Sequence, residues 1–172
     1  MKGFTLLETL VALSIFTFLI LAIFGIMDLG RASWFTASAA VEVHQEIIKS
    51  FMKMEKEFRN TRPAEVSLTS GTSSASITFR VPQDTDGDGD VLDAIGGIEW
   101  SGDITYALNS SDQITRTASG VPSILANSIV SLLFTRPIAS VDIIQVDITA
   151  RKTSFARRQF QETGQIIIKM RN

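Results

Sequence analysis

The sequence predicts an α+β protein in which one long N-terminal helix, transmembrane in its first half, packs on an antiparallel β-sheet domain. Three observations lead to this fold class. The chain begins with an apolar run over residues 4–27, in which Glu8 is the only formal charge. Apolar residues then recur with helical spacing as far as residue 58. After residue 61 the pattern changes to alternating strands and turns, and a helix followed by a run of strands is typical of α+β domains.

The apolar run over residues 4–27 is long enough to cross a membrane. At a rise of about 1.5 Å per residue, a helix over these residues extends about 36 Å, which exceeds the ~30 Å hydrocarbon core of a bilayer. A secretory signal peptide would have a shorter apolar core followed by a small-residue cleavage site, and this sequence does not follow that order. A charged side chain at mid-membrane costs about 2.5–3.5 kcal/mol, so Glu8 requires a partner.

The helical pattern continues over residues 28–60, which we interpret as the amphipathic half of the same helix. Its apolar residues recur at i, i+4, i+7 and i+11 and form a stripe on one face: Ile47, Phe51, Met54 and Phe58. We expect this stripe to pack against the sheet. Pro63 predicts the end of the helix, because proline disfavours helical geometry in the residue before it.

Residues 61–172 are predicted to form a β-rich globular domain. We expect strands over residues 66–68, 76–81, 95–100, 104–108, 113–116, 129–134, 141–150 and 165–172. Residues 70–74 and 109–112 have the composition of turns. Residues 124–128 are expected to form a loop or a short helical turn, and residues 152–164, which are polar and basic, a surface loop.

Composition excludes several classes of function. The chain contains no cysteine, so thiol catalysis and disulfides are excluded, and its single histidine, His44, cannot form a multi-histidine metal centre. We expect a surface or packing role for His44. The 16 basic and 18 acidic residues form no clustered cationic face, and no nucleic-acid partner is expected. Because no nucleophile elbow, phosphate loop or zinc spacing occurs, we predict that the protein is not an enzyme.

An acidic loop is the candidate metal site. It contains five carboxylates within ten residues: Asp84, Asp86, Asp88, Asp90 and Asp93. Calcium-binding loops use oxygens at positions one, three and five with glycine at position six, and Gly89 follows Asp88 at that spacing. We therefore predict calcium as a cofactor, with Asp90 contributing its backbone carbonyl. The alternative is a solvated acidic turn that binds no ion.

The same loop departs from an EF-hand. An EF-hand requires a bidentate glutamate at position twelve, where this chain has Ile95, and no helical pattern flanks the loop. We therefore reject an EF-hand domain. Asp93 or Glu99 is expected to complete the calcium coordination.

The start of the chain resembles the class III signal of type IV pilin-like proteins. The resemblance is carried by a short basic leader that ends in Gly3, followed by Phe4 and by Glu8 at the fifth position after the glycine. It implies that a prepilin peptidase removes residues 1–3 and methylates the new amine of Phe4. The ammonium of Phe4 in one subunit would then pair with the Glu8 carboxylate of the next, offsetting the cost of two isolated charges in lipid. The alternative is a plain single-pass anchor with a tolerated glutamate.

The order of the predicted elements resembles J-type minor pseudopilins of type II secretion and W-type minor type IV pilins. This resemblance implies a pilin-like fold and a minor subunit that assembles through its helix into a pseudopilus or pilus, supporting initiation of filament assembly or protein secretion. The implied partners are other pilins or pseudopilins of the same filament, the prepilin peptidase, an inner-membrane assembly platform and membrane lipid. We expect a single-pass protein of the cytoplasmic membrane with its globular domain outside the cytoplasm. A competing interpretation is a calcium-dependent pilus-tip adhesin that binds a surface through residues 84–99.

Overall fold

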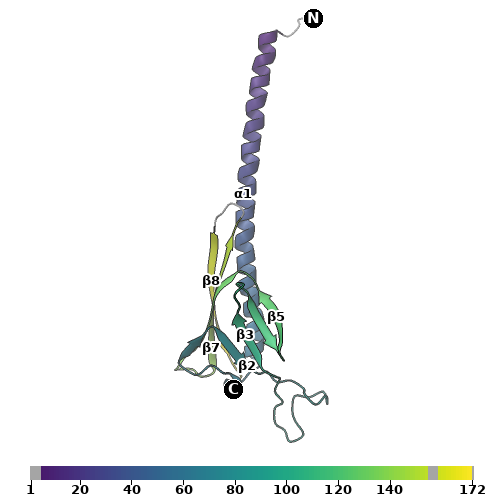
Figure 1. Cartoon of the computed structure of the whole chain (residues 1–172), viewed down its shortest axis with the longest axis vertical. Helices are drawn as coiled ribbons and strands as arrows, with labels where there is room; N and C mark the ends of the chain where they lie inside the picture. The colour runs from purple at the N-terminus through teal and green to yellow at the C-terminus, as the bar shows by residue number, and fades with distance from the viewer. Residues whose placement is uncertain (1–4, 155–158, 172) are drawn as a thin grey trace.

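A computed structural model describes residues 5–154 and 159–171 of the chain. Helix α1 (Leu6–Phe58) is a single helix of 53 residues. Its N-terminal half projects away from the rest of the molecule, whereas the strands gather around its C-terminal half (Figure 1). The predicted α+β fold, one long apolar helix packed on antiparallel sheets, is confirmed.

The C-terminal half of α1 is held by tertiary packing. Burial along the helix begins at Ala39 and includes Ala39, Val43, Ile47, Ser50, Met54, Glu57 and Phe58. The predicted stripe therefore faces the domain, with Phe51 half-buried between its fully buried members. The backbone N–H of Arg59 closes the last turn on Glu55. Pro63 then begins a short 3₁₀ helix, η1 (Pro63–Glu65), as expected for a proline just after a helix end.

The described strands form two antiparallel sheets instead of the one that we expected. The first sheet has the order β2 (Ser76–Phe79), β3 (Ile104–Leu108), β4 (Ile114–Ala118), β5 (Val121–Ala126). The second has the order β1 (Thr72–Ser74), β6 (Ile129–Arg136), β7 (Ile143–Thr153), β8 (Gln159–Lys169). The long strands β7 and β8 run up alongside α1 (Figure 1).

Phe58 joins α1 to both sheets. Its ring centroid lies 4.5 Å from that of Phe79 in β2 and 6.2 Å from that of Tyr106 in β3. It also lies 6.2 Å from the ring centroid of Phe134 in β6, which belongs to the second sheet. All four rings are fully buried. The core therefore sits where the last turn of the helix meets the two sheets.

Helix α1 also approaches β8 closely, and Gly164 permits this approach. A Cβ atom at this position would lie 2.7 Å from Ile47 Cγ2 and 2.8 Å from Phe51 Cε2, both on α1. These separations are shorter than van der Waals contact. The glycine is therefore required by packing and not by its backbone angles.

Several strand predictions were wrong. Residues 72–74, which we predicted as a turn, form β1, and β5 lies across residues 121–126, where we expected no strand. Residues 66–68 and 95–100 form no strand, and the chain there makes only isolated bridges, Val66 with Phe79, Pro82 with Trp100 and Leu92 with Ile98. The predicted surface loop at residues 152–164 contains the end of β7 and the first half of β8.

The sequence did not predict the first half of β8 as a strand, and the reason is physical. Its outward positions carry polar side chains, including Gln159, Gln161 and Thr163, while the inward positions before Ile166 are Phe160, Glu162 and Gly164. Only one of these three inward residues is strongly apolar, so the period-two pattern of a half-buried strand is almost absent. Pairing with β7 over eleven residues supplies the structure that the pattern does not indicate.

Candidate functional site

The start of α1 carries a capping box. Thr5 is the N-cap residue, and its Oγ1 accepts a hydrogen bond from the backbone N–H of Glu8 at 3.3 Å. In return, the backbone N–H of Thr5 donates to Glu8 Oε2 at 3.4 Å. The helix therefore begins at a defined residue, and its first acidic side chain lies at the positive end of the helix dipole. Gly3 and Phe4, the predicted cleavage and methylation residues, lie outside the described residues.

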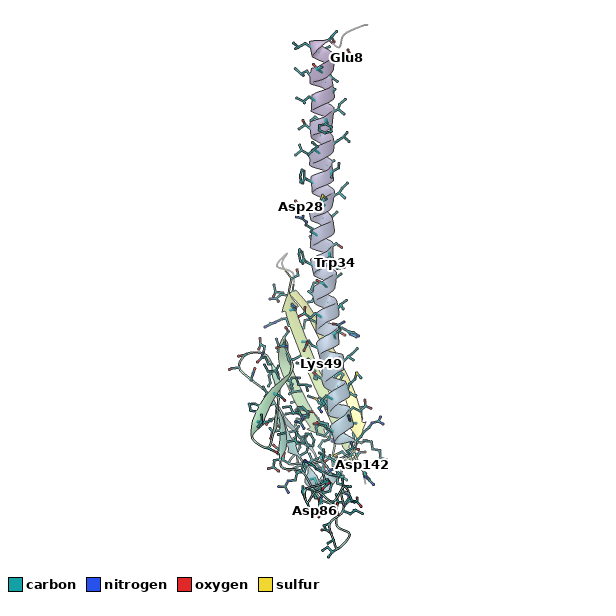
Figure 2. The ribbon with its side chains drawn as sticks, turned by 90° about the vertical axis from the view of Figure 1, so that its right-hand side faces the viewer. Glu8, Asp28, Trp34, Lys49, Asp86 and Asp142 are labelled. Carbon is teal, nitrogen blue, oxygen red and sulfur yellow. The ribbon has the colours of Figure 1, made fainter. Side chains whose placement is uncertain are left out.

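The Glu8 carboxylate keeps acceptor capacity beyond this contact. A carboxylate offers about four lone-pair directions on two oxygens, and the Thr5 N–H uses one of them. Glu8 lies at the extreme end of the projecting helix (Figure 2). The capping box thus orients the carboxylate near the chain terminus and leaves it accessible to a cation from another molecule.

The projecting half of α1 has the properties of a membrane span. By length and composition it can cross a membrane, since an 18-residue window reaches a mean hydropathy of 2.7 and none of it is buried against the domain. Its hydroxyl groups bond within the helix, with Thr9 donating to Leu6, Ser14 to Val11 and Thr17 to Leu13. Such internal bonding satisfies polar groups that lipid cannot solvate.

The acidic loop lies at the opposite end of the molecule, where Asp86 is found far from Glu8 (Figure 2). Three carboxylates converge there, because ligand oxygens of Asp84, Asp86 and Glu99 lie within 4.8 Å of one another. Glu99 is one of the two residues, with Asp93, that we expected to complete the calcium coordination. Asp88, Asp90 and Asp93 are not part of this group.

Backbone hydrogen bonds shape the loop around Asp84. Its two carboxylate oxygens accept from the backbone N–H groups of Gly87 at 2.6 Å and Gly89 at 2.9 Å. Both glycines have positive φ, +83° and +90°, which other residues rarely adopt. Glu99 Oε2 accepts from the backbone N–H and the hydroxyl of Thr85. The two glycines between the aspartates thus allow the loop to turn back on the Asp84 carboxylate.

The other aspartates have local roles. Asp88 and Asp90 each accept a backbone N–H within two residues. Asp93 Oδ1 accepts from the backbone N–H of Ile95 at 3.0 Å and of Gly97 at 2.7 Å, which closes a separate turn. This second turn explains why Asp93 does not join the cluster.

The donor set at Asp84, Asp86 and Glu99 suits a hard cation. Calcium takes six to eight oxygen ligands at about 2.3–2.6 Å, so two ligands on one ion lie at most about 5 Å apart. The 4.8 Å limit that encloses these three carboxylates meets this requirement. The three residues fit a calcium ion whose remaining ligands would be water or backbone carbonyls.

A buried polar network, which the sequence analysis missed, connects α1 to the first sheet. Glu57 is almost fully buried and accepts hydrogen bonds from Tyr106 Oη at 2.7 Å and Arg116 Nε at 3.0 Å. Lys53 Nζ lies 3.0 Å from Glu57 Oε1, one turn earlier on the helix. Arg116 lies on the same face of β4 as Ile114 and Ala118. A charged side chain on an apolar strand face was the sequence signal that could have predicted a buried acidic partner.

The network shifts the pKa values of its members. Burial alone would raise the pKa of Glu57, but hydrogen bonds from Tyr106, Arg116 and Lys53 outweigh it and lower the pKa below its ordinary value. Burial and the neighbouring Glu57 carboxylate raise the pKa of Tyr106. Glu57 is therefore a carboxylate and Tyr106 a neutral donor at neutral pH. This arrangement fixes the helix on the first sheet.

His44 lies at the surface. Its Nδ1 is 2.8 Å from Glu162 Oε1 on β8, and nearby Lys152 on β7 pairs with Glu42 on α1. These two contacts tie the upper ends of β7 and β8 to the helix. The sequence predicted either a surface role or a packing role for His44. In the structure its imidazole makes a contact at the surface.

Comparison with known proteins supports the interpretation of the N-terminus. Residues 1–24 match the family model described as the prokaryotic N-terminal methylation motif. This motif is the class III signal peptide of type IV pilins, and the predicted resemblance is confirmed for this segment. Neither the curated proteins nor the solved structures yield a match to the chain.

Proposed function

We propose that the chain is a minor pilin or pseudopilin subunit that assembles through its N-terminal helix into a type II secretion pseudopilus or a type IV pilus. The observation that carries this proposal is the methylation motif over residues 1–24, together with an apolar N-terminal half of α1 that no part of the domain covers. Its role is structural, and its partners are other pilins or pseudopilins and the prepilin peptidase.

The mechanism depends on the capping box. Cleavage after Gly3 leaves the Phe4 amine one residue before Thr5, whose N–H already bonds to Glu8. In the membrane, a Glu8 carboxylate fixed at the helix end accepts the N-methylated Phe4 ammonium of a neighbouring subunit. The pairing removes two unpaired charges from lipid and fixes the axial position of one helix against the next.

Substitution of Glu8 tests this mechanism. Glu8→Ala and Glu8→Gln should both be processed to methylated Phe4, as read by mass spectrometry of the membrane protein, and both should be lost from purified filaments. Glu8→Gln is the matched control for capping, because its amide oxygen still accepts the Thr5 N–H while the charge is gone. Normal incorporation of Glu8→Gln would contradict the charge pairing, and an unprocessed wild-type terminus would contradict the proposed function.

We further propose where the protein lies in the cell envelope and at which step of filament assembly it acts. The domain lies outside the cytoplasm, the helix enters from the cytoplasmic (inner) membrane, and an assembly platform in that membrane supplies the force of assembly. The likeness to J-type minor pseudopilins or W-type minor pilins predicts a role in starting a filament. Deleting the gene should then reduce the number of filaments or the secreted protein without shortening those filaments that still form.

We also propose that Asp84, Asp86 and Glu99 bind calcium. The convergence of their ligand oxygens supports this site, and Asp88, Asp90 and Asp93 are proposed to contribute only through the shape of the loop. Calcium should raise the thermal midpoint of the full chain in detergent, and a chelator should reverse the rise. Asp84→Asn should abolish the calcium response and Asp90→Asn should preserve it. An unchanged midpoint with calcium in the wild type would contradict the site.

A calcium-dependent adhesin is the second candidate function. The observation that favours it is the exposed apolar side chain of Ile95, which is 93% accessible. Ile95 belongs to the segment 84–99, whose Asp86 lies at the opposite end of the molecule from Glu8 (Figure 2). Loss of attachment with normal filament assembly after removal of residues 84–99 would favour the adhesin. Loss of assembly would favour the structural role.

A further inference from the structure

A hollow beside the last turn of α1 collects positively charged side chains, and we call it the basal pocket. It has a volume of about 310 Å³, and its lining includes Lys53, Lys56, Glu57, Val81, Pro82 and Arg171. It lies at the other end of α1 from Glu8 (Figure 2). The residues after β8 reach it because the backbone N–H of Arg171 donates to the carbonyl of Thr61 at 3.0 Å.

The basal pocket carries an excess of positive charge. Among the described residues that line it, Glu57 is the only carboxylate, against the three cations Lys53, Lys56 and Arg171. Glu57 already pairs with Lys53 at 3.0 Å and with Arg116, a cation outside the lining, at 3.0 Å. Within residues 5–154 and 159–171, neither Lys56 nor Arg171 has a carboxylate within ion-pair distance. Two lining cations are therefore left without a counter-ion.

The helix dipole explains only part of this charge. Cations in the last turn of a helix are stabilised by its partial negative charge, which suffices to explain Lys53 and Lys56. That partial charge is equivalent to about half an electron, so it compensates a minor share of two unpaired cations. Arg171 follows β8 and enters the basal pocket from a different element. The convergence of Lys56 and Arg171 thus has no explanation in the helix itself.

A neighbouring hollow, which Arg171 also lines, has balanced charge. Its volume is about 550 Å³, and Arg59 and Lys169 contribute to its lining. Arg59 pairs with Glu55 at 2.6 Å, and Lys169 Nζ lies 3.5 Å from Asp142 Oδ2. Each cation that belongs to this hollow alone therefore has an acidic partner, and the unpaired charge is concentrated in the basal pocket.

The side chains of the basal pocket suit a phosphate group. A guanidinium such as that of Arg171 binds phosphate oxygens with two parallel hydrogen bonds, and the Lys56 ammonium adds a point charge. A phosphomonoester carries a charge of about −1.5 to −2 at neutral pH, which matches the two unpaired cations, whereas one carboxylate would leave a cation unmatched. Val81 and Pro82 are half-buried and form an apolar wall for the group that carries the phosphate.

We propose that the basal pocket binds a dianionic phosphate through Lys56 and Arg171, with free phosphate or a phosphorylated carbohydrate as its source. This inference goes beyond the proposed function and does not depend on it, because the lining lies outside the membrane-spanning half of α1. It gives the domain a ligand that lateral association of the helix does not require.

Calorimetric titration of the full chain with inorganic phosphate tests the basal pocket. The protein is held in a nonionic detergent without calcium, at constant ionic strength and at about pH 8, where phosphate is mostly a dianion. We expect saturable binding at one site. Lys56→Gln combined with Arg171→Gln should weaken it about tenfold or more, because each substitution removes a charge-assisted hydrogen bond.

A second double variant controls for net charge. Lys49→Gln combined with Arg151→Gln removes the same charge from exposed residues outside the basal pocket and should bind phosphate as the wild type does. Thermal midpoints without phosphate should agree among the three proteins. Absence of phosphate binding in the wild type, or equal weakening in both double variants, would overturn the proposal.

Glucose 1-phosphate separates the two sources of phosphate. Binding at least as tight as that of inorganic phosphate indicates a phosphorylated carbohydrate, and weaker binding or none indicates the free ion. Glucose itself should not bind, and binding of glucose as tight as that of its phosphate would overturn the proposal. These titrations are independent of whether Glu8 variants enter filaments, so failure here leaves the proposed function intact.

Discussion

Residues 6–27 and residues 39–58 belong to one uninterrupted helix, yet their surroundings have little in common. The first segment is exposed along its whole length and its side-chain hydrogen bonds stay within the helix. The second buries one face against both sheets and sends Glu57 into a buried network. The same backbone geometry is therefore maintained by capping and hydrogen bonds within the helix in one segment, and by tertiary packing in the other. Substitutions in the two segments should have separable consequences for assembly and for domain stability.

Removal of an aromatic ring should show the largest difference. Phe58→Ala is expected to destabilise the domain by about 3–5 kcal/mol, because it leaves a cavity between α1 and both sheets. Phe24→Ala, in the exposed segment, should leave domain unfolding unchanged. Urea unfolding of the full chain in detergent, followed by near-ultraviolet circular dichroism, measures both. Equal losses in the two variants would contradict the separation of the segments.

Loss of the Glu57 charge should have the next largest effect. Glu57→Gln is expected to cost about 2–3 kcal/mol, since it weakens charged hydrogen bonds to Tyr106 and Arg116 in a buried position. Glu55→Gln is the matched control on the same turn of α1. It breaks a surface pair with Arg59 and should cost less than about 1 kcal/mol. The same unfolding measurement compares them, and a Glu55→Gln loss as large as that of Glu57→Gln would contradict a special role for the network.

The Glu57 carboxylate should also make the domain sensitive to acid. Its pKa in the folded protein lies below its ordinary value of 4.5, so the stabilisation is complete above about pH 4.5 and is lost as the pH falls through the folded pKa. Below pH 4.5, the wild-type unfolding free energy should decline more steeply than that of Glu57→Gln. Parallel pH profiles for the two proteins would contradict this assignment.

Glycine substitutions provide a smaller contrast between the two environments. Gly164→Ala should destabilise the domain by about 1–2 kcal/mol, because the new Cβ would meet Ile47 and Phe51 at less than 3 Å. Gly25→Ala has no atom within 4 Å of its new Cβ and should leave domain unfolding unchanged, while it favours the helix in the membrane span. Thermal midpoints of the two variants measure this difference. A stabilised Gly164→Ala would show that α1 can move away from β8.

The sequence predicted those parts of the fold where one physical pattern acts alone. The apolar run, the stripe at Ile47 to Phe58 and strands such as residues 104–108 all have clear periods, and the structure has them. The first half of β8 and the edge strand β5 were missed. Pro122 lies within β5, and Val121 and Ile124 are exposed, so pairing with β4, and not burial, makes it a strand. Such elements depend on partners that are distant in sequence.

The candidate sites also divide into features that local sequence determines and features that depend on distant parts of the chain. Alternating aspartate and glycine predicted the loop at Asp84, because short-range hydrogen bonds to backbone N–H groups determine its shape. The sequence could not decide between Asp93 and Glu99, since the approach of Glu99 to Asp84 depends on how the chain returns after the second turn at Asp93. The sequence did not predict the Glu57 network for a similar reason. Tyr106 and Arg116 lie 49 and 59 residues after Glu57 in the chain, so only the fold brings them together.

Loss of the N-cap should have the smallest and most local effect. Thr5→Ala removes the acceptor for the Glu8 N–H, and capping of this kind stabilises a helix by about 1 kcal/mol, so the amides of the first turn should exchange with solvent about fivefold faster. Thr9→Ala is the matched control, because its hydroxyl bonds to Leu6 within the helix and caps nothing. Hydrogen exchange of the full chain in detergent measures both, and domain amides should be unaffected in either variant. Equal acceleration in Thr9→Ala would mean that the first turn is maintained by its hydroxyl groups in general. The capping box would then not be what orients Glu8 toward the chain terminus. Another interaction would have to position Glu8 for its pairing with Phe4 of a neighbouring subunit.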